Sequence, residues 1–232
     1  ARTHGVPVHP IDVLHSAWDC TLEAVAAPPS PAPPPALRLG MRLIRGLPQA
    51  EAEKIAAAVR TRTPGAKEGG FTSILALWRA SGVKVATLKR LAEADAFGSL
   101  GLDRQHALWE IGKLRDVALP LLEDLDTPPL AARPAVSDTP LPAMPLSRLV
   151  VHDYGATGLS LKAHPLSFVR DQLRHLGLAE CAALADPART PDHSPIAVAG
   201  LVLVRQRPGT ASGVVFVNLE DETGTANLVA RP

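Results

Sequence analysis

Two proline-rich stretches limit what this chain can fold into. The first, APPSPAPPPA at residues 27–36, holds six prolines in ten residues, and the second, TPPLAARPAVSDTPLPAMP, covers residues 127–145. Proline has a fixed φ and no backbone N–H, so neither stretch is suited to a helix interior or an inner strand. We interpret both as spacers that separate the folded parts of the chain.

Composition narrows the class of protein further. Aromatic residues make up only 3% of the chain against 46% hydrophobic residues in total, so the core must be mostly aliphatic. The 24 basic and 23 acidic residues give a net charge of +1, so any nucleic-acid contact must rest on local clusters of cations. The two cysteines, Cys20 and Cys181, lie far apart. They indicate a reducing cytoplasm rather than a disulfide scaffold or a zinc site.

No apolar stretch is long enough to cross a bilayer, so we expect a cytoplasmic protein without a membrane partner. The chain opens ARTHGVPVHP, without an initiator Met or a signal peptide, and we expect it to be an excised fragment.

Helical spacing of apolar residues dominates the region between the two spacers. Segments with this spacing are 50–60, 71–80, 84–95 and 103–115. Asp103 precedes the last of them, where its side chain is suited to cap a helix. After the second spacer, SFVRDQLRHLGL at 167–178 predicts a short amphipathic helix that ends near Gly177.

The pattern changes to that of strands after Ser194. Three strands are predicted, at about 196–205, 214–220 and 225–230, and Val215, Val217 and Leu219 share one face of the second. Three strands at this spacing, with a Gly inside the first, are typical of the start of a small OB-type barrel. The acidic run 220–222 falls in a tight turn, where we expect charged side chains to face water.

The stretch LIRGLPQAEAEKI at 43–55 predicts a tight turn between two apolar segments. Gly46, Leu47, Ala52 and Ile55 fit the spacing of a helix-hairpin-helix, whose turn offers N–H groups to a phosphate. Pro48 occupies the position of the second Gly and removes one of those donors. Glu51 and Glu53 add negative charge nearby, so a plain packing turn stays an alternative. The cations that would attract DNA here are Arg42, Arg45, Lys54, Arg60 and Arg62.

A second hairpin is predicted at 88–111, around the turn Gly98–Gly101. Its candidate DNA-binding residues are Gly98, Gly101, Lys84, Lys89, Arg90 and Arg104. Periodicity alone fits equally well a solvated basic face on a helical hairpin. In the predicted strands, Arg205 and Arg207 are the candidate DNA contacts.

Residues able to carry bond-making chemistry are not apparent in the sequence. It contains no Ser-His-Asp signature and no Gly-rich phosphate loop. Potential metal ligands gather near the start of the chain, at His4, His9, Asp12, His15, Asp19 and Cys20, but their spacing matches no known metal-site pattern. We therefore predict no catalytic residue and no bound metal or other cofactor in this chain.

The segment SPIAVAGLVLVRQRPGTASGVVFVNLEDETGTANLV (194–229) closely resembles the OB region of bacterial error-prone DNA polymerases of the C family, relatives of the replicative DNA polymerase III alpha subunit. Upstream segments agree in order. Residues 8–23 resemble the end of the fingers region, 37–55 and 88–111 resemble the tandem hairpins, and 153–173 resemble the helical connection. The resemblance covers nearly the whole chain apart from the proline-rich stretches. Pro48 departs from the family pattern.

The resemblance implies a mostly α tandem helix-hairpin-helix region followed by a partial all-β OB-type barrel. Its segments would be 1–36 (end of the fingers and spacer), 37–126 (hairpins), 127–192 (linker and connecting helix) and 193–232 (first OB strands).

For function, the resemblance implies the C-terminal part of a translesion polymerase acting in DNA repair and replication. Its palm aspartates, upstream of residue 1, would hold Mg²⁺ for templated nucleotidyl transfer. This part would grip primer–template duplex, contact single-stranded template and meet mutasome accessory proteins. The alternatives are a stand-alone nucleic-acid-binding module without catalysis and a structural remnant.

Overall fold

The computed structural model describes residues 5–24, 35–61, 71–114, 141–210 and 213–232. The chain forms two compact units. The first comprises Ala1–Met144 with His152–Leu161, and the second comprises Pro145–Val151 with Lys162–Pro232. Helix α5 (Leu146–Thr157) therefore contributes to both units. Residues 8–24 and 35–38 belong to the same unit as the hairpins.

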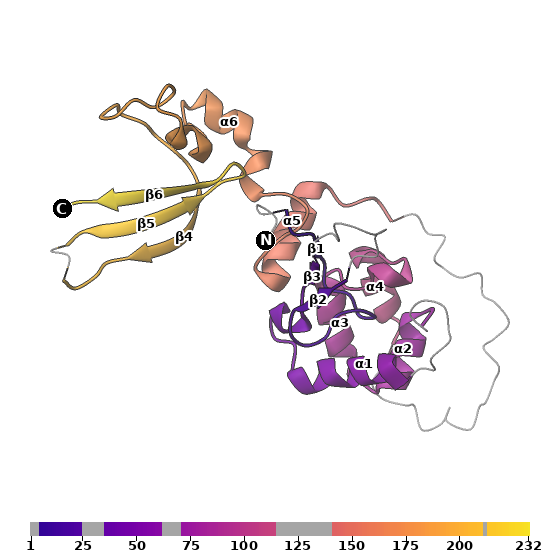
Figure 1. The fold of residues 1–232 in the computed structure, drawn as a ribbon. Helices are drawn as coiled ribbons and strands as arrows, with labels where there is room; N and C mark the ends of the chain where they lie inside the picture. Colours follow the sequence, from indigo (N-terminus) through magenta and orange to yellow (C-terminus); the bar gives the residue numbers. More distant parts are fainter. Residues whose placement is uncertain (1–4, 25–34, 62–70, 115–140, 211–212) are drawn as a thin grey trace, which may run out of the picture. The chain divides into compact units, whose positions relative to one another are not determined.

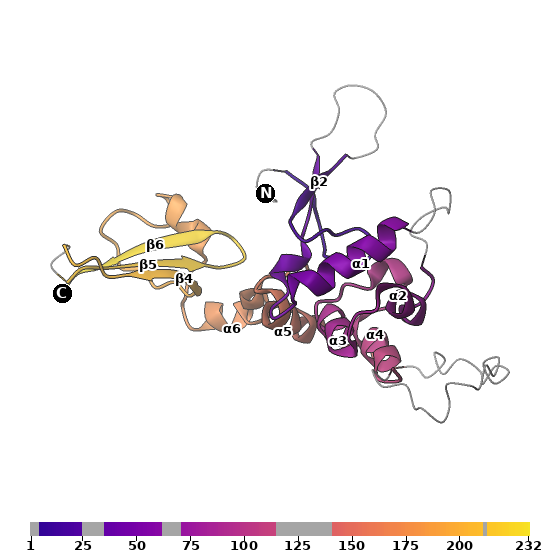
Figure 2. The ribbon, with the colours of Figure 1, turned by 90° about the horizontal axis from the view of Figure 1, so that it is seen from below.

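Four helices make up most of the first unit (Figures 1 and 2): α1 (Gln49–Thr61), α2 (Ile74–Ser81), α3 (Val85–Glu93) and α4 (Arg104–Ile111). All four were predicted from apolar periodicity. Their shared core is aliphatic apart from a few aromatic side chains, and Ile55, Leu88 and Leu91 are fully buried in it. Asp103 caps α4 as predicted, because its carboxylate accepts a hydrogen bond from the His106 N–H.

A small sheet, not predicted from the sequence, lies at the start of the first unit. Strand β1 (Val8–His9) pairs in parallel with β3 (Ala36–Arg38), and β2 (Thr21–Glu23) pairs with the other edge of β3 in antiparallel fashion. Arg38 donates to both oxygens of Glu23 at 2.8 Å. Two or three residues are too few to show the alternation by which strands are recognised. The proline-rich stretch thus ends in the central strand of this sheet, at Ala36.

The second unit contains a three-stranded antiparallel sheet in the order β4 (Leu201–Gln206), β5 (Val215–Glu220) and β6 (Thr225–Ala230) (Figure 1). These are the three strands predicted from the sequence, although the first begins later than expected. Gly200 precedes it, where an added Cβ would lie 2.7 Å from the Leu219 Cβ, so only glycine fits. The described residues form no closed barrel, and the OB-type fold stays a prediction.

Helix α6 (Arg170–His175) is shorter than the helix predicted at 167–178. A 3₁₀ turn at Pro165–Phe168 precedes it, and Val169 between the two has a non-helical φ of −120°. A further 3₁₀ turn at Cys181–Ala185 follows. None of the described helices combines the length and the apolar character needed to span a membrane.

Candidate nucleic-acid interface

The first predicted hairpin turn is built around Gly46, whose φ of 70° lies in the left-handed region that favours glycine. Leu47 points into the core, and its N–H donates to the Ile44 carbonyl at 3.2 Å. Ala52 and Ile55 are also buried, as the motif requires. Leu47 therefore anchors the turn. Its side chain is buried, although the sequence predicts Leu47 among the DNA-binding residues.

Arg90 of α3 lies directly over this turn. A Cβ added to Gly46 would be 2.5 Å from Arg90 Nη1, and the same nitrogen donates to the Arg45 carbonyl at 3.2 Å. Arg90 itself remains exposed to solvent. The two hairpins predicted separately thus meet here, because a helix of the second one supplies a guanidinium to the turn of the first.

Arg45 fixes the turn to the last turn of α5. Its N–H donates to the Ala156 carbonyl at 2.9 Å, and its Nη1 donates to the Gly155 carbonyl at 3.3 Å. Carbonyls at the end of a helix have no partner within the helix, so these bonds satisfy them. Arg45 holds the turn in place and still exposes its side chain beside Gly46.

Glu51 does not present its charge at the turn, contrary to our expectation. Its side chain is buried, and Oε2 accepts hydrogen bonds from the Lys84 N–H at 3.0 Å and from Thr87 Oγ1 at 3.1 Å. Oε1 accepts from Lys54 Nζ at 2.6 Å. Hydrogen bonds from Lys54 first, and then from the Lys84 N–H, lower the pKa of Glu51. Glu51, a residue of α1, thus caps the N-terminal end of α3 with its side chain.

Two N–H groups of the second predicted turn, those of Ser99 and Gly101, already have acceptors within the chain. Gly98–Leu100 forms a 3₁₀ turn, and Gly101 follows with a φ of 71°. The Gly101 N–H donates to the Gly98 carbonyl at 2.9 Å, and the Ser99 N–H donates to Asp12 Oδ2 at 3.0 Å. The sequence predicts Gly101 as a DNA-binding residue, but its N–H already donates to a carbonyl of the same turn.

Asp12, His15 and Ser99 lie within hydrogen-bonding distance of one another beneath this turn. His15 Nδ1 is 3.0 Å from Asp12 Oδ1 and 3.1 Å from Ser99 Oγ. A catalytic relay needs both ring nitrogens, one for the acid and one for the nucleophile, whereas both contacts here share Nδ1. Burial raises the pKa of Asp12, but hydrogen bonds from Ser99, Leu14 and His15 lower it overall. The cluster supports the turn and does not have the geometry of a nucleophilic site.

Arg104 is placed differently from our prediction. We expected it to face a DNA backbone, but its side chain is buried and pairs with Asp153 of α5. The other oxygen of Asp153 accepts a hydrogen bond from Ser160 Oγ at 2.7 Å. Helical periodicity could not reveal this, because Asp153 lies 49 residues further along the chain.

The remaining predicted cations fall into three groups. Five are exposed in the first unit: Lys84, Lys89, Arg60, Lys54 and Arg42. Lys54 forms an ion pair with Glu51, and Arg42 forms one with Asp19. Arg205 and Arg207 are exposed in the second unit. Arg62 lies outside the described residues. Of the predicted cations that the structure describes, Arg45 and Arg90 are joined to each other, at the Gly46 turn.

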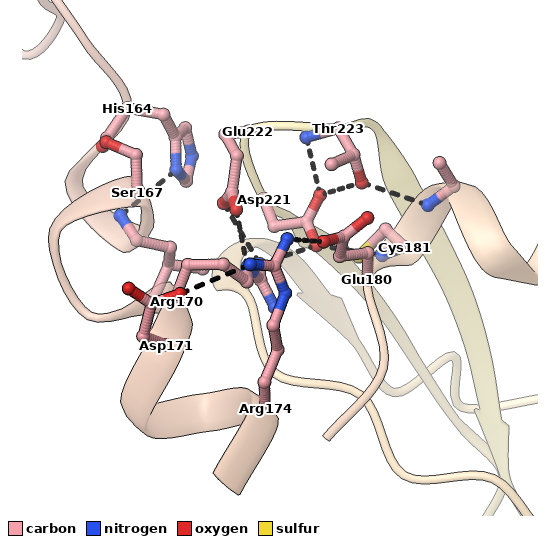
Figure 3. Close-up of polar contacts among 12 residues, drawn as sticks. His164, Ser167, Arg170, Asp171, Arg174, Glu180, Cys181, Asp221, Glu222 and Thr223 are labelled. Carbon is pink, nitrogen blue, oxygen red and sulfur yellow. Dashed lines mark hydrogen bonds and ion pairs between the residues drawn. The ribbon is translucent and has the colours of Figure 1, made fainter. Parts of the chain in front are cut away.

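One member of the acidic run of the second unit, Asp221, does not face water as expected, whereas Glu222 is exposed. Asp221, at the turn between β5 and β6, is 3% exposed. It accepts hydrogen bonds from Arg170 Nη2 at 2.9 Å and from the Cys181 N–H at 2.8 Å. Figure 3 shows Arg170 reaching from α6 to both Asp221 and Glu222. Burial would raise the pKa of Asp221, but hydrogen bonds led by that of Thr223 lower it to about 2.

Comparison with known proteins identifies the family. The chain is 47% identical along its whole length to error-prone DNA polymerase 2 of Rhizobium meliloti (strain 1021) and 42% identical over 99% of its length to the error-prone DNA polymerase of Sinorhizobium medicae (strain WSM419). The chain belongs to the error-prone DNA polymerases. It spans 20% and 21%, respectively, of the length of these two family members.

A family model described as a helix-hairpin-helix motif matches residues 5–107. The match begins before β1 and ends within α4, so it contains the small sheet and both predicted turns. This agrees with the structure of the first unit, in which the sheet and the hairpins belong together.

Proposed function

We propose that this segment holds the phosphate backbone of primer–template DNA, as the C-terminal part of an error-prone DNA polymerase of the C family. The observation that carries the proposal is the position of Arg90 over the Gly46 turn. It places an exposed guanidinium beside a backbone turn that belongs to the matched helix-hairpin-helix region.

Arg90 also accounts for the unusual Pro48. Proline at this position removes a backbone N–H that a phosphate would otherwise accept from. A guanidinium carries five N–H donors in a planar fork that suits phosphate oxygens. One nitrogen of Arg90 donates to the Arg45 carbonyl, and the side chain as a whole is exposed. A side chain of α3 thus replaces the donor that the turn of the first hairpin lacks.

The complete enzyme, in this proposal, extends primers by templated nucleotidyl transfer across damaged bases in the cytoplasm, with mutasome accessory proteins. Its Mg²⁺-binding carboxylates lie outside this chain. Within the described ranges, no group of three or more His, Cys, Asp or Glu side chains is arranged to hold a metal ion. The buried carboxylates Asp12, Glu51 and Asp221 all accept internal hydrogen bonds.

Binding measured by fluorescence anisotropy on duplexes of scrambled sequence tests the proposal. Phosphate contacts carry no direct sequence information, so affinity should not depend on the sequence. Affinity should fall steeply between about 50 and 200 mM salt, because each neutralised phosphate releases counterions. Arg90→Gln should reduce the salt slope by about 1. Combined Ala substitutions of Lys84, Lys89 and Arg90 should flatten the slope further.

Lys113→Gln provides the matched control, since Lys113 is an exposed cation of the same unit that pairs with Glu110. It should leave the slope unchanged. A slope that Arg90→Gln does not alter, or a strong preference for one sequence, would contradict the proposal.

A further inference from the structure

A pocket of about 490 Å³ opens beside the turn that joins α2 to α3. Its lining consists of Trp78, Arg79, Gly82, Val83 and Lys84. Gly82 closes α2 in the left-handed conformation, with a φ of 61°, and an added Cβ would meet no atom within 4 Å. The absence of a side chain at Gly82 therefore helps to leave this space open.

The indole of Trp78 is held in one orientation at this pocket. Its Nε1 donates to the Val83 carbonyl at 2.9 Å, which joins the side chain to the turn that forms the other wall. The ring cannot rotate away without losing this bond. Trp78 is half-buried and packs against the hydrophobic core on one side, while it lines the pocket on the other. Proteins stack unpaired bases on aromatic rings held in this way, because every base has a π-face.

The charges around the pocket favour an anion. Arg79 and Lys84 both line it and are exposed. Glu51, the acid that contacts Lys84 through its backbone N–H, is buried and also accepts a hydrogen bond from Lys54. Its charged partner is thus Lys54, which does not line the pocket, and in the described part of the chain it forms no ion pair with the side chain of Arg79 or Lys84.

We propose that this pocket binds one unpaired nucleotide of a single-stranded nucleic acid, with the base against Trp78 and the phosphate near Arg79 and Lys84. Its volume lies within the range of small-molecule sites, about 300–1,000 Å³. The site goes beyond the duplex grip, because it recognises a base that has left the helical stack and uses neither Gly46 nor Arg90. Lys84 belongs to both sets of cations, so the two proposals are separated by the base, which only the pocket contacts.

Two oligonucleotides test the pocket on the full 232-residue chain. One is oligothymidine of about twelve nucleotides, a length within the usual site sizes of single-strand binders, and the other is its abasic counterpart. Both carry the same phosphates, so only the first can stack on Trp78. Anisotropy should show about tenfold tighter binding of the oligothymidine, in line with the value of one stacked base.

Gly82→Asn should remove this preference. Asparagine tolerates the left-handed conformation, and its side chain would occupy the open space. Oligothymidine should then bind no better than the abasic strand, whereas duplex binding and its salt slope should be unchanged. Lys113→Gln, the matched control, should keep the full preference. Equal binding of the two oligonucleotides by the unmodified chain would overturn the proposal.

A second readout does not depend on that variant. With Trp18→Phe and Trp109→Phe, Trp78 is the sole tryptophan, since the chain has three. Its fluorescence should be quenched by oligothymidine and unaffected by the abasic strand. Thymidine triphosphate at the same nucleotide concentration should quench it far less. Equal quenching by the free nucleotide would overturn the assignment to a single strand, and no quenching by oligothymidine would overturn the site altogether.

Discussion

Arg104 of α4 and Asp153 of α5 form an ion pair whose side chains are only 2% and 9% exposed. Removing one partner from such a pair leaves the other charge buried without compensation. The pair therefore makes the joint between α4 and α5 sensitive to single substitutions. Helix α5 also accepts the Arg45 hydrogen bond that positions the Gly46 turn, at the Ala156 carbonyl.

Asp153→Ala should lower the free energy of unfolding of the first unit by about 3–5 kcal/mol. Denaturant titration followed by tryptophan fluorescence measures this unit selectively, since Trp18, Trp78 and Trp109 all belong to it. The control is Asp19→Ala, which removes an exposed ion pair with Arg42 and should change stability far less, because solvent screens exposed pairs. Equal losses in the two variants would contradict this account of the buried pair.

Glu51 should make the first unit sensitive to acid. Its pKa in the folded chain lies below the ordinary 4.5, so its contribution is complete above about pH 4.5 and is lost as the pH falls through the folded value. Glu51→Gln should lower stability at neutral pH and make the acid-induced loss shallower. Asp12, whose pKa is also lowered, should leave a remaining slope. Glu53→Gln on the exposed face of α1 should reproduce neither effect when unfolding is measured between pH 3 and pH 7.

Asp221 should play the corresponding part in the second unit. Its pKa falls from the ordinary 3.8 to about 2, so its stabilising contribution is present above about pH 3.8 and disappears as the pH falls towards 2. Asp221→Asn should weaken the unit at neutral pH and remove much of this acid sensitivity. The intensities of the β5 amide signals in an NMR acid titration measure it. Asp171→Asn, at an exposed ion pair with Arg174, should behave like the unmodified chain.

Amide exchange should be faster in β4 than in α3. Val202 and Leu203 of β4 are 60% and 51% exposed, whereas Leu88 and Leu91 of α3 are fully buried. Local opening is easiest where few apolar contacts must be broken. Hydrogen exchange resolved by residue should therefore show weak protection at Val202 and strong protection at Leu88. Similar protection at the two residues would refute this ranking.

Much of the architecture follows from local pattern. Aliphatic periodicity located α1 to α4, and alternation located the three strands of the second unit, because each pattern arises within a dozen neighbouring residues. The strands β1 to β3 escaped prediction, since two or three residues establish no period. The Gly46 turn was recognised from its spacing, but its contact with Arg90 joins residues 44 positions apart in the sequence.

The charged residues show why the candidate site was harder to predict. Sequence reasoning places an isolated charge at the surface, because burial without a partner is unfavourable. Arg104, Glu51 and Asp221 are buried all the same, since each has partners between 33 and 51 residues away as well as any nearby ones. Such pairs depend on tertiary structure, and no local window contains both members.

The capping of α3 by Glu51 has a consequence for how this region can be inherited or engineered. Cutting the chain between the two hairpins would leave the start of α3 without its acceptor and would leave a carboxylate on α1 without its donors. Neither half would keep its polar groups satisfied after grafting onto another scaffold. Recombination among relatives, or a designed chimera, should therefore succeed only at joints outside the tandem hairpins, which exchange as a single block.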